Sequence, residues 1–251
     1  MQDTKENENY LASLANIIMK LIITGATGFV GKELVRQSLG RREITSVVAV
    51  ARSPVPVPDN LPDGSDASKL HSVTISDYTE YPDAVKKEFA GADACIWTVA
   101  ITPSKSRGQD FEVVKRICQT STVAGINAIH QAGPARPFRF LYISGAAAER
   151  DQTKTPRFLP QYFLMRGETE NQVLKFAAEH EGFEAAAARP GMIHGPDECL
   201  RPIVGAFYQA ILGIHSIRVD NLSRVMLNQV INGFEKETLS DGDLVRLSNT
   251  K

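Results

Sequence analysis

The stretch Lys20-Leu-Ile-Ile-Thr-Gly-Ala-Thr-Gly-Phe-Val-Gly-Lys-Glu-Leu-Val-Arg-Gln-Ser-Leu39 decides the fold of this chain. It opens with an apolar run short enough for a buried strand, passes through Gly25, Gly28 and Gly31, and continues with apolar residues at helical spacing. A strand, a glycine turn and a helix in this order bring a phosphate group to the N-terminus of the helix. The stretch therefore predicts a phosphate-binding βα unit rather than an ordinary glycine-rich turn.

Each glycine has its own physical role in such a unit. Gly25 allows a sharp turn out of the strand, Gly28 lacks the Cβ that would keep a pyrophosphate from the backbone, and Gly31 allows the helix to pack close to the sheet. The spacing is G-x-x-G-x-x-G and not the commoner G-x-G-x-x-G. The triad indicates a phosphate-binding turn because it lies between a predicted strand and a predicted helix.

Length, charge and composition narrow the class of protein. The 251 residues fit one α/β domain with a substantial core, since 43% are hydrophobic. The net charge of −1 gives no electrostatic basis for binding nucleic acid or an anionic membrane, and no apolar run has the length of a membrane span. The three cysteines include no C-x-x-C pair, which indicates a reducing compartment, and the histidine pattern predicts no metal site.

The first residues are polar and net acidic. The stretch 1–18 looks like neither a secretory signal nor a transit peptide, so we expect a loose tail before a single domain over 19–251. We expect a cytoplasmic protein, and peripheral attachment to an organelle stays open.

The segment Thr24-Gly-Ala-Thr-Gly-Phe-Val-Gly31 resembles the T-G-A-T-G-x-x-G opening of the short-chain dehydrogenase/reductase superfamily. It is most similar to the atypical, NmrA-like branch of NAD(P)H-binding proteins with extended-type glycine motifs. The resemblance covers 19–251 and implies a doubly wound, mainly parallel Rossmann sheet with helices on both faces. It further implies that the turn holds the cofactor through Gly25, Thr27, Gly28, Phe29, Val30 and Gly31.

The second predicted strand ends at Ala51-Arg52-Ser53. In a dinucleotide fold an acid at this strand end selects NAD, whereas a cation accommodates the 2′-phosphate of NADP. Arg52 and Ser53 therefore predict a preference for NADP(H) over NAD(H), unless Arg52 is only a solvated loop residue. By the resemblance, the ends of later strands complete the cofactor site with Asp77, Thr98, Val99, Ala100, Pro190, Gly191 and Ile193, and an exposed turn is the alternative for Asp77.

Three residues match the catalytic positions of the superfamily. Ser144 stands at the end of the fifth predicted strand, at the edge where an open α/β sheet has its crevice. Tyr162 and Arg166 take the places of the tyrosine and lysine of Y-x-x-x-K, a spacing that puts both on one helix face. The resemblance implies that the serine holds the substrate oxygen, the tyrosine transfers the proton, and the cation binds the nicotinamide ribose and lowers the tyrosine pKa.

Arg166 is the main departure from the family pattern. Arginine keeps the positive charge and can bind ribose hydroxyls, but it cannot release a proton at working pH. The charge of Arg166 can still act on the pKa of Tyr162, whereas a proton relay that depends on lysine is lost. The alternative for Tyr162 is a helix-entry tyrosine that packs on the sheet.

The remaining pattern predicts helices over 81–90, 109–132 and 161–180, the last two of which could pair subunits in a homodimer. The apolar spacing at 202–214 predicts a further helix, within a substrate lid over about 195–225. His194 replaces the more usual tyrosine of the family's turn, and whether it has a polar role at the pocket stays open. A helix capped by Asp220 or Asn221 and a closing strand over Leu244–Ser248 complete the expected fold.

These features predict an NADP-dependent reductase of the short-chain dehydrogenase/reductase type that acts on a small carbonyl or enone-like substrate. Two alternatives stay open because Y-x-x-x-K is altered. One is a non-redox isomerase, dehydratase or cyclase on the same scaffold. The other is an NADP-sensing regulatory or scaffold protein.

Overall fold

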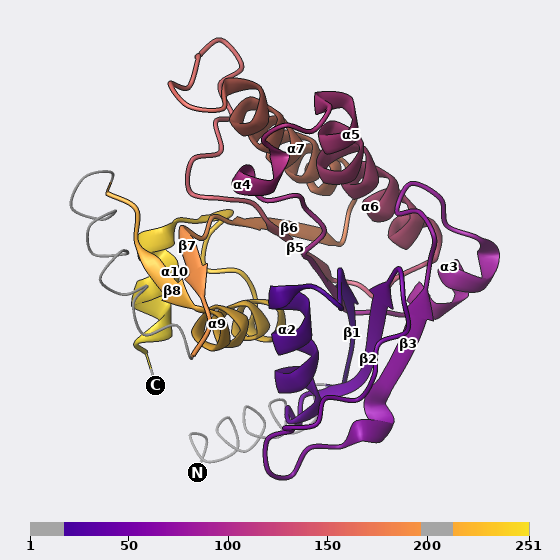
Figure 1. Ribbon diagram of the computed structural model, residues 1–251. Helices are drawn as coiled ribbons and strands as arrows, with labels where there is room; N and C mark the ends of the chain where they lie inside the picture. Colours follow the sequence, from indigo (N-terminus) through magenta and orange to yellow (C-terminus); the bar gives the residue numbers. More distant parts are fainter. Residues whose placement is uncertain (1–17, 197–212, 251) are drawn as a thin grey trace, which may run out of the picture.

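A seven-stranded parallel sheet runs through the molecule, with helices on both of its faces (Figure 1). The computed structural model describes residues 18–196 and 213–250. The strand order is β3-β2-β1-β4-β5-β6-β9, and it reverses direction between β1 and β4. The strands are β1 (Met19–Thr24), β2 (Ile44–Ala51), β3 (Leu70–Thr74), β4 (Ala94–Trp97), β5 (Phe138–Ile143), β6 (Phe183–Ala188) and β9 (Thr238–Leu239). The expected doubly wound Rossmann sheet is confirmed, and such a fold binds its ligand where the order reverses.

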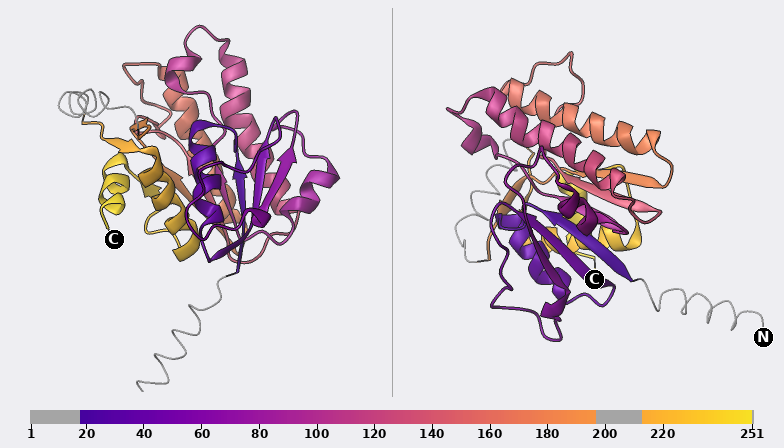
Figure 2. Two further views of the ribbon diagram at one scale, coloured as in Figure 1. Left: turned by 60° about the horizontal axis from the view of Figure 1, so that its bottom comes forward. Right: turned by 90° about the vertical axis from the view of Figure 1, so that its right-hand side faces the viewer.

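The two faces of the sheet are covered by different helices (Figure 2). On one face lie α2 (Phe29–Leu39) and α9 (Val219–Asn232), with α10 (Asp241–Ser248) beside α9. On the other lie α3 (Asp83–Phe89), α6 (Ser121–Gln131) and α7 (Pro160–Glu179). Strand β1 is apolar on both sides because Leu21 and Ile23 enter the first core and Ile22 the second. The apolar run of β1 is therefore continuous rather than alternating.

The long helix expected over 109–132 is present, but it contains one irregular turn. It consists of α5 (Phe111–Lys115), a π-helical turn η2 (Arg116–Thr120) and α6. The hydroxyls of Ser121 and Thr122 donate to main-chain oxygens in this turn, on Ile117 and Cys118. The short helix α4 (Pro103–Ser106) precedes it.

The predicted closing strand over Leu244–Ser248 is wrong, because these residues belong to α10. Ser240 and Asp243 form a capping box, in which each side chain accepts a hydrogen bond from the other's backbone N–H at 3.1 Å. This Ser-x-x-Asp pattern starts a helix, and the sheet already closes with the two residues of β9.

The predicted cap of α9 is also wrong. The helix begins at Val219, so Asp220 lies in its first turn, and its carboxylate instead accepts from Arg218 and from the N–H of Asn221.

Several expectations fall wholly or partly beyond the described part of the chain. The tail lies outside it except for its last residue, and so does most of the helix expected over 202–214. The flanks of that region are described, and there β7 (Met192–His194) pairs in parallel with β8 (Ser216–Arg218). Among the described residues, no helix is both long and apolar enough to cross a membrane.

Candidate functional site

The glycine turn opens at the carboxyl end of β1. Gly25 has a φ of +65°, which favours glycine, and its carbonyl accepts from Gly28 N–H at 2.8 Å. Gly28 precedes the first residue of α2 without a side-chain cap, so the first N–H groups of the helix have no partner within the helix. Thr27, Gly28 and Phe29 are exposed, whereas a Cβ on Gly31 would lie 2.2 Å from the Gly25 oxygen. The turn is thus an open backbone cradle with positive polarity.

Tyr78 fixes this cradle, and sequence reasoning missed it. Its hydroxyl donates to the Val50 oxygen at 2.9 Å and accepts from Gly25 N–H at 3.1 Å, so it joins the ends of β1 and β2. The only sequence signal was its place beside the predicted Asp77. The Asp77 carboxylate is already occupied, by the N–H and hydroxyl of Thr79 and by Arg116. These contacts, with Thr79 the stronger, hold the pKa of Asp77 below its usual value.

The predicted residues beside the cradle follow β2 and β4. Arg52 and Ser53 are exposed at the end of β2, and within the described residues the Arg52 guanidinium makes neither a hydrogen bond nor an ion pair. Thr98 follows β4 and donates to the Thr24 oxygen at 2.6 Å. Thr98 and Val99 lie directly against the glycine turn, because a Cβ on Gly25 would be 2.5 Å from the Thr98 hydroxyl oxygen and 3.4 Å from the Val99 nitrogen.

Ser144 and Arg166 lie together at the carboxyl end of β5. Arg166 is buried on α7, donates through Nη2 to the main-chain oxygen of Ile143, and lies 4.8 Å from the ring centre of Tyr142. Ser144 follows Ile143 directly, and its N–H donates to the Ala188 oxygen at 2.7 Å. The Oγ of Ser144 and the Nη1 of Arg166 are buried, and neither has a hydrogen-bond partner among residues 18–196 and 213–250. Such atoms are costly unless a ligand or water satisfies them.

Tyr162 is buried in the first turn of α7, one helical turn before Arg166. Its hydroxyl donates to the main-chain oxygen of Ile101 at 2.8 Å, a partner that no sequence pattern could reveal. Burial raises the pKa of Tyr162 to about 12, although Arg166 acts in the opposite direction. The phenol is therefore protonated, and its hydroxyl is hydrogen-bonded to the segment that follows β4.

The turn after β6 approaches the Ser144 segment. Pro190 accepts from Ala146 N–H at 3.0 Å, and a Cβ on Gly191 would lie 2.1 Å from the His215 oxygen. Ile193 lies in β7, partly buried against the core. His194 is buried with Nδ1 3.3 Å from the Gly195 oxygen, so its ring nitrogen faces its own chain.

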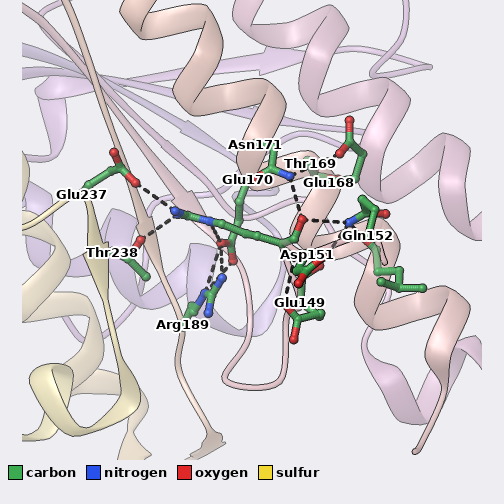
Figure 3. Close-up of polar contacts among 12 residues, drawn as sticks. Glu149, Asp151, Gln152, Glu168, Thr169, Glu170, Asn171, Arg189, Glu237 and Thr238 are labelled. Atoms are coloured by element: carbon green, nitrogen blue, oxygen red, sulfur yellow. Dashed lines mark hydrogen bonds and ion pairs between the residues drawn. The ribbon is translucent and has the colours of Figure 1, made fainter. Parts of the chain in front are cut away.

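Glu170 is a second residue that the sequence reasoning missed. It is fully buried one turn after Arg166, and both Arg150 and Arg189 contact its carboxylate (Figure 3). The signal was an acid four residues after Arg166, which continues the spacing of Tyr162 and Arg166 along one helix face.

These residues fit a nicotinamide dinucleotide. The cradle has no Cβ at Gly28 where a pyrophosphate would approach, and Ser144 and Arg166 each hold a buried polar atom in need of a partner. In the described part of the chain, no three His, Cys, Asp or Glu side chains are grouped to hold a metal ion.

The fold and the cradle together define a Rossmann-type α/β protein built to bind a dinucleotide. Residues 25–204 match the model of the NAD(P)H-binding family, and the chain belongs to that family.

The curated relatives include an epimerase, and the solved structures with a similar fold include a reductase domain. ADP-L-glycero-D-manno-heptose-6-epimerase from Pseudomonas aeruginosa is 36% identical over 136 residues, which cover 48% of this chain and 38% of that protein. The chain thus matches under half the length of this curated relative. The reductase domain of PhqB from Penicillium fellutanum has a TM-score of 0.65 at 19% identity over 90% of this chain and 67% of its own. MoeE5 with UDP-glucuronic acid and NAD has a TM-score of 0.62 at 19% identity over 87% and 74%.

Proposed function

We propose that the protein is an NADP(H)-dependent reductase that acts on a small carbonyl or enone-like substrate. The observation that carries the proposal is a pair of buried atoms without a hydrogen-bond partner in the described part of the chain, Ser144 Oγ and Arg166 Nη1, with the buried Tyr162 one helical turn before Arg166. Ser144 and Arg166 lie at the carboxyl end of β5, and the Tyr162 hydroxyl lies on the segment that follows β4, so both contacts are at the edge of the sheet where the glycine turn follows β1. This edge is where an open α/β sheet places its reactive crevice.

Each residue has one task in the proposed reaction. NADPH supplies the hydride when it is bound. Ser144 Oγ orients the substrate oxygen, and Arg166 Nη1 holds a ribose hydroxyl while Nη2 stays on Ile143. Tyr162 keeps the proton for the substrate oxygen, because its raised pKa keeps the phenol neutral. The substrate oxygen must then replace the Ile101 oxygen as the acceptor of this proton.

Arg52 supports the preference for NADP(H). It is exposed at the end of β2, and within the described residues no acid pairs with it. A guanidinium there can form a charge-assisted bond with the 2′-phosphate, which NADH lacks. Such bonds contribute about 1.5–3 kcal/mol, roughly tenfold or more in affinity.

The test of cofactor choice is a titration of the parent protein with NADPH and NADH. We expect tighter binding of NADPH, and we expect Arg52→Ala to remove most of the difference. Arg42→Ala is a suitable control, because Arg42 is an exposed cation two residues before β2, at the other end of the strand from Arg52. Equal affinity of the parent protein for both cofactors would refute the preference.

The test of the reaction follows with saturating NADPH and a panel of carbonyl and enone compounds. A reductase consumes NADPH, which the loss of nicotinamide absorbance reports. Cofactor binding without consumption across the panel would favour a non-redox enzyme or a regulatory protein instead.

A non-redox enzyme is the second candidate, and the epimerase relative favours it. In that case product forms from a sugar-nucleotide-like substrate with no net consumption of cofactor, and product analysis by mass spectrometry separates it from the reductase. Pairing of two subunits through α6 and α7, and a cytoplasmic location, stay predictions.

A further inference from the structure

Glu170 carries a buried carboxylate that has no role in the proposed reaction. Its side chain is 0% exposed and points between two arginines (Figure 3). Arg150 Nε donates to Oε2 at 2.7 Å, while Arg189 donates through Nη2 to Oε2 at 2.6 Å and through Nε to Oε1 at 3.0 Å. A carboxylate away from water is costly unless it is paired and fully hydrogen-bonded. The two arginines therefore fix the position of the Glu170 carboxylate, and the carboxylate in turn fixes both guanidinium groups.

Arg150 ends the segment that leaves Ser144. This segment lies on α7, because Glu149 N–H donates to the Phe163 oxygen at 3.1 Å. A Cβ on Gly167 would lie 1.8 Å from the Glu149 oxygen, so the close approach depends on a glycine. The contact between Arg150 and Glu170 closes the segment against the helix at its far end.

Arg189 begins the turn that leads through Pro190 to Gly191. Its N–H donates to the Leu239 oxygen at 2.8 Å, and the Pro190 oxygen accepts from Ala146 in the Ser144 segment. Its guanidinium reaches back to Glu170 and contacts both carboxylate oxygens. One carboxylate thus ties the two segments that leave β5 and β6 to the helix that carries Tyr162 and Arg166.

We propose that Glu170 is a positioning residue for the nicotinamide half of the cofactor site, acting through Arg150 and Arg189. This inference rests on the proposed function, because it assigns the nicotinamide to the α7 side. Across the described chain, no hydrogen bond of these three residues reaches the glycine turn or Arg52. The effect of Glu170 is therefore confined to one half of the dinucleotide.

The test compares the whole cofactor with its adenosine half. Glu170→Gln keeps the size of the side chain but turns an amide group toward one arginine. We expect the Kd for NADPH to rise about tenfold, since a small displacement of oriented groups has large effects. The Kd for adenosine 2′,5′-bisphosphate, which carries no nicotinamide, should stay within about twofold, because the glycine turn and Arg52 are untouched. Calorimetry on the full chain, well below its melting temperature, measures both constants.

Glu237→Gln is the matched control. Glu237 is the exposed member of the same network, 2.9 Å from Arg150, with a side chain that is 63% exposed. An exposed pair contributes little, so both ligands should bind as they do to the parent protein.

Arg189→Lys is the second variant, in case the loss of the buried charge prevents folding. Lysine keeps the charge beside Glu170 but cannot contact both carboxylate oxygens with two nitrogens. We expect the same selective loss of NADPH affinity.

The outcomes separate a positioning role from a structural one. Weakening of NADPH alone in either variant supports the proposal. Equal weakening of both ligands, or unchanged NADPH affinity in both variants, overturns it. A parent protein that binds neither ligand overturns the proposed function, and the positioning role with it.

Discussion

The two halves of the candidate site, at the glycine turn and at α7, present different chemical groups to a ligand. The glycine turn is backbone: its polar groups are the N–H groups at the start of α2, and Thr27, Gly28 and Phe29 around it are exposed. The α7 half consists of side chains, and Ser144, Tyr162 and Arg166 are all buried. Tyr78 already fixes the first half, whereas the second contains two buried atoms that no described residue hydrogen-bonds and a phenol bound to Ile101.

This difference separates binding from chemistry. A backbone cradle needs no rearrangement before a phosphate enters, so we infer that it supplies affinity. Buried side chains that are held by their own chain must exchange partners when substrate arrives, so we infer that they supply the chemistry. Variants of the glycine turn should therefore change affinity, and a variant of the side chain that transfers the proton should change turnover.

The largest effect is expected from Gly28→Val. Gly28 has a φ of −75°, which valine can adopt, and within the described structure its Cβ would meet the Gly25 oxygen, at 3.0 Å. The fold should therefore survive with a loss of about 1–2 kcal/mol, whereas the side chain occupies the space of the pyrophosphate. We expect loss of NADPH binding in a calorimetric titration, with circular dichroism as the check of folding.

Gly40→Val at the other end of α2 is the control for this variant. Gly40 also has a negative φ, and its Cβ would meet side-chain atoms of Ser65 and Pro62 at 3.1–3.4 Å. It should bind NADPH normally. Normal binding by Gly28→Val would show that the glycine turn is not the cofactor site.

A smaller effect, on turnover alone, is expected from Tyr162→Phe. Phenylalanine keeps the ring and its packing but removes the proton and the bond to Ile101. General acid catalysis contributes about 10²–10⁴-fold, so NADPH consumption should fall by that factor while the Kd for NADPH stays nearly constant. Full activity in this variant would contradict the role of Tyr162 and would end the separation between the two halves.

How far the sequence predicts each half follows from the same difference. The glycine turn could be predicted because its backbone geometry requires glycine at Gly25 and Gly31. The hydrogen bond of Tyr162 to Ile101 and the ion pair of Asp77 with Arg116 could not be predicted. Main-chain acceptors and pairs that are distant in the sequence leave no local pattern. The closing strand failed for a local reason, since the capping box at Ser240 and Asp243 outweighed a short apolar run.

The effect of pH between 7 and 10 should be the smallest, and it tests whether burial or Arg166 controls Tyr162. In the family pattern the cation lowers the pKa of the tyrosine, but here burial is the stronger influence and raises it to about 12. A raised pKa keeps the proton-donating form populated as pH increases, so turnover at saturating NADPH should show no fall due to Tyr162 up to pH 10. Above pH 10 the unfolded chain releases its tyrosine protons before the folded one, so stability declines from 10 toward 12 and sets the upper limit of the measurement. A fall in turnover with a midpoint between 7 and 9.5, absent from the residual activity of Tyr162→Phe, would show that Arg166 outweighs burial once ligands are bound. The pKa of Tyr162 would then be controlled by the neighbouring cation, as the Y-x-x-x-K pattern implies, and the hydrogen bond of Tyr162 to Ile101 would have to break on binding.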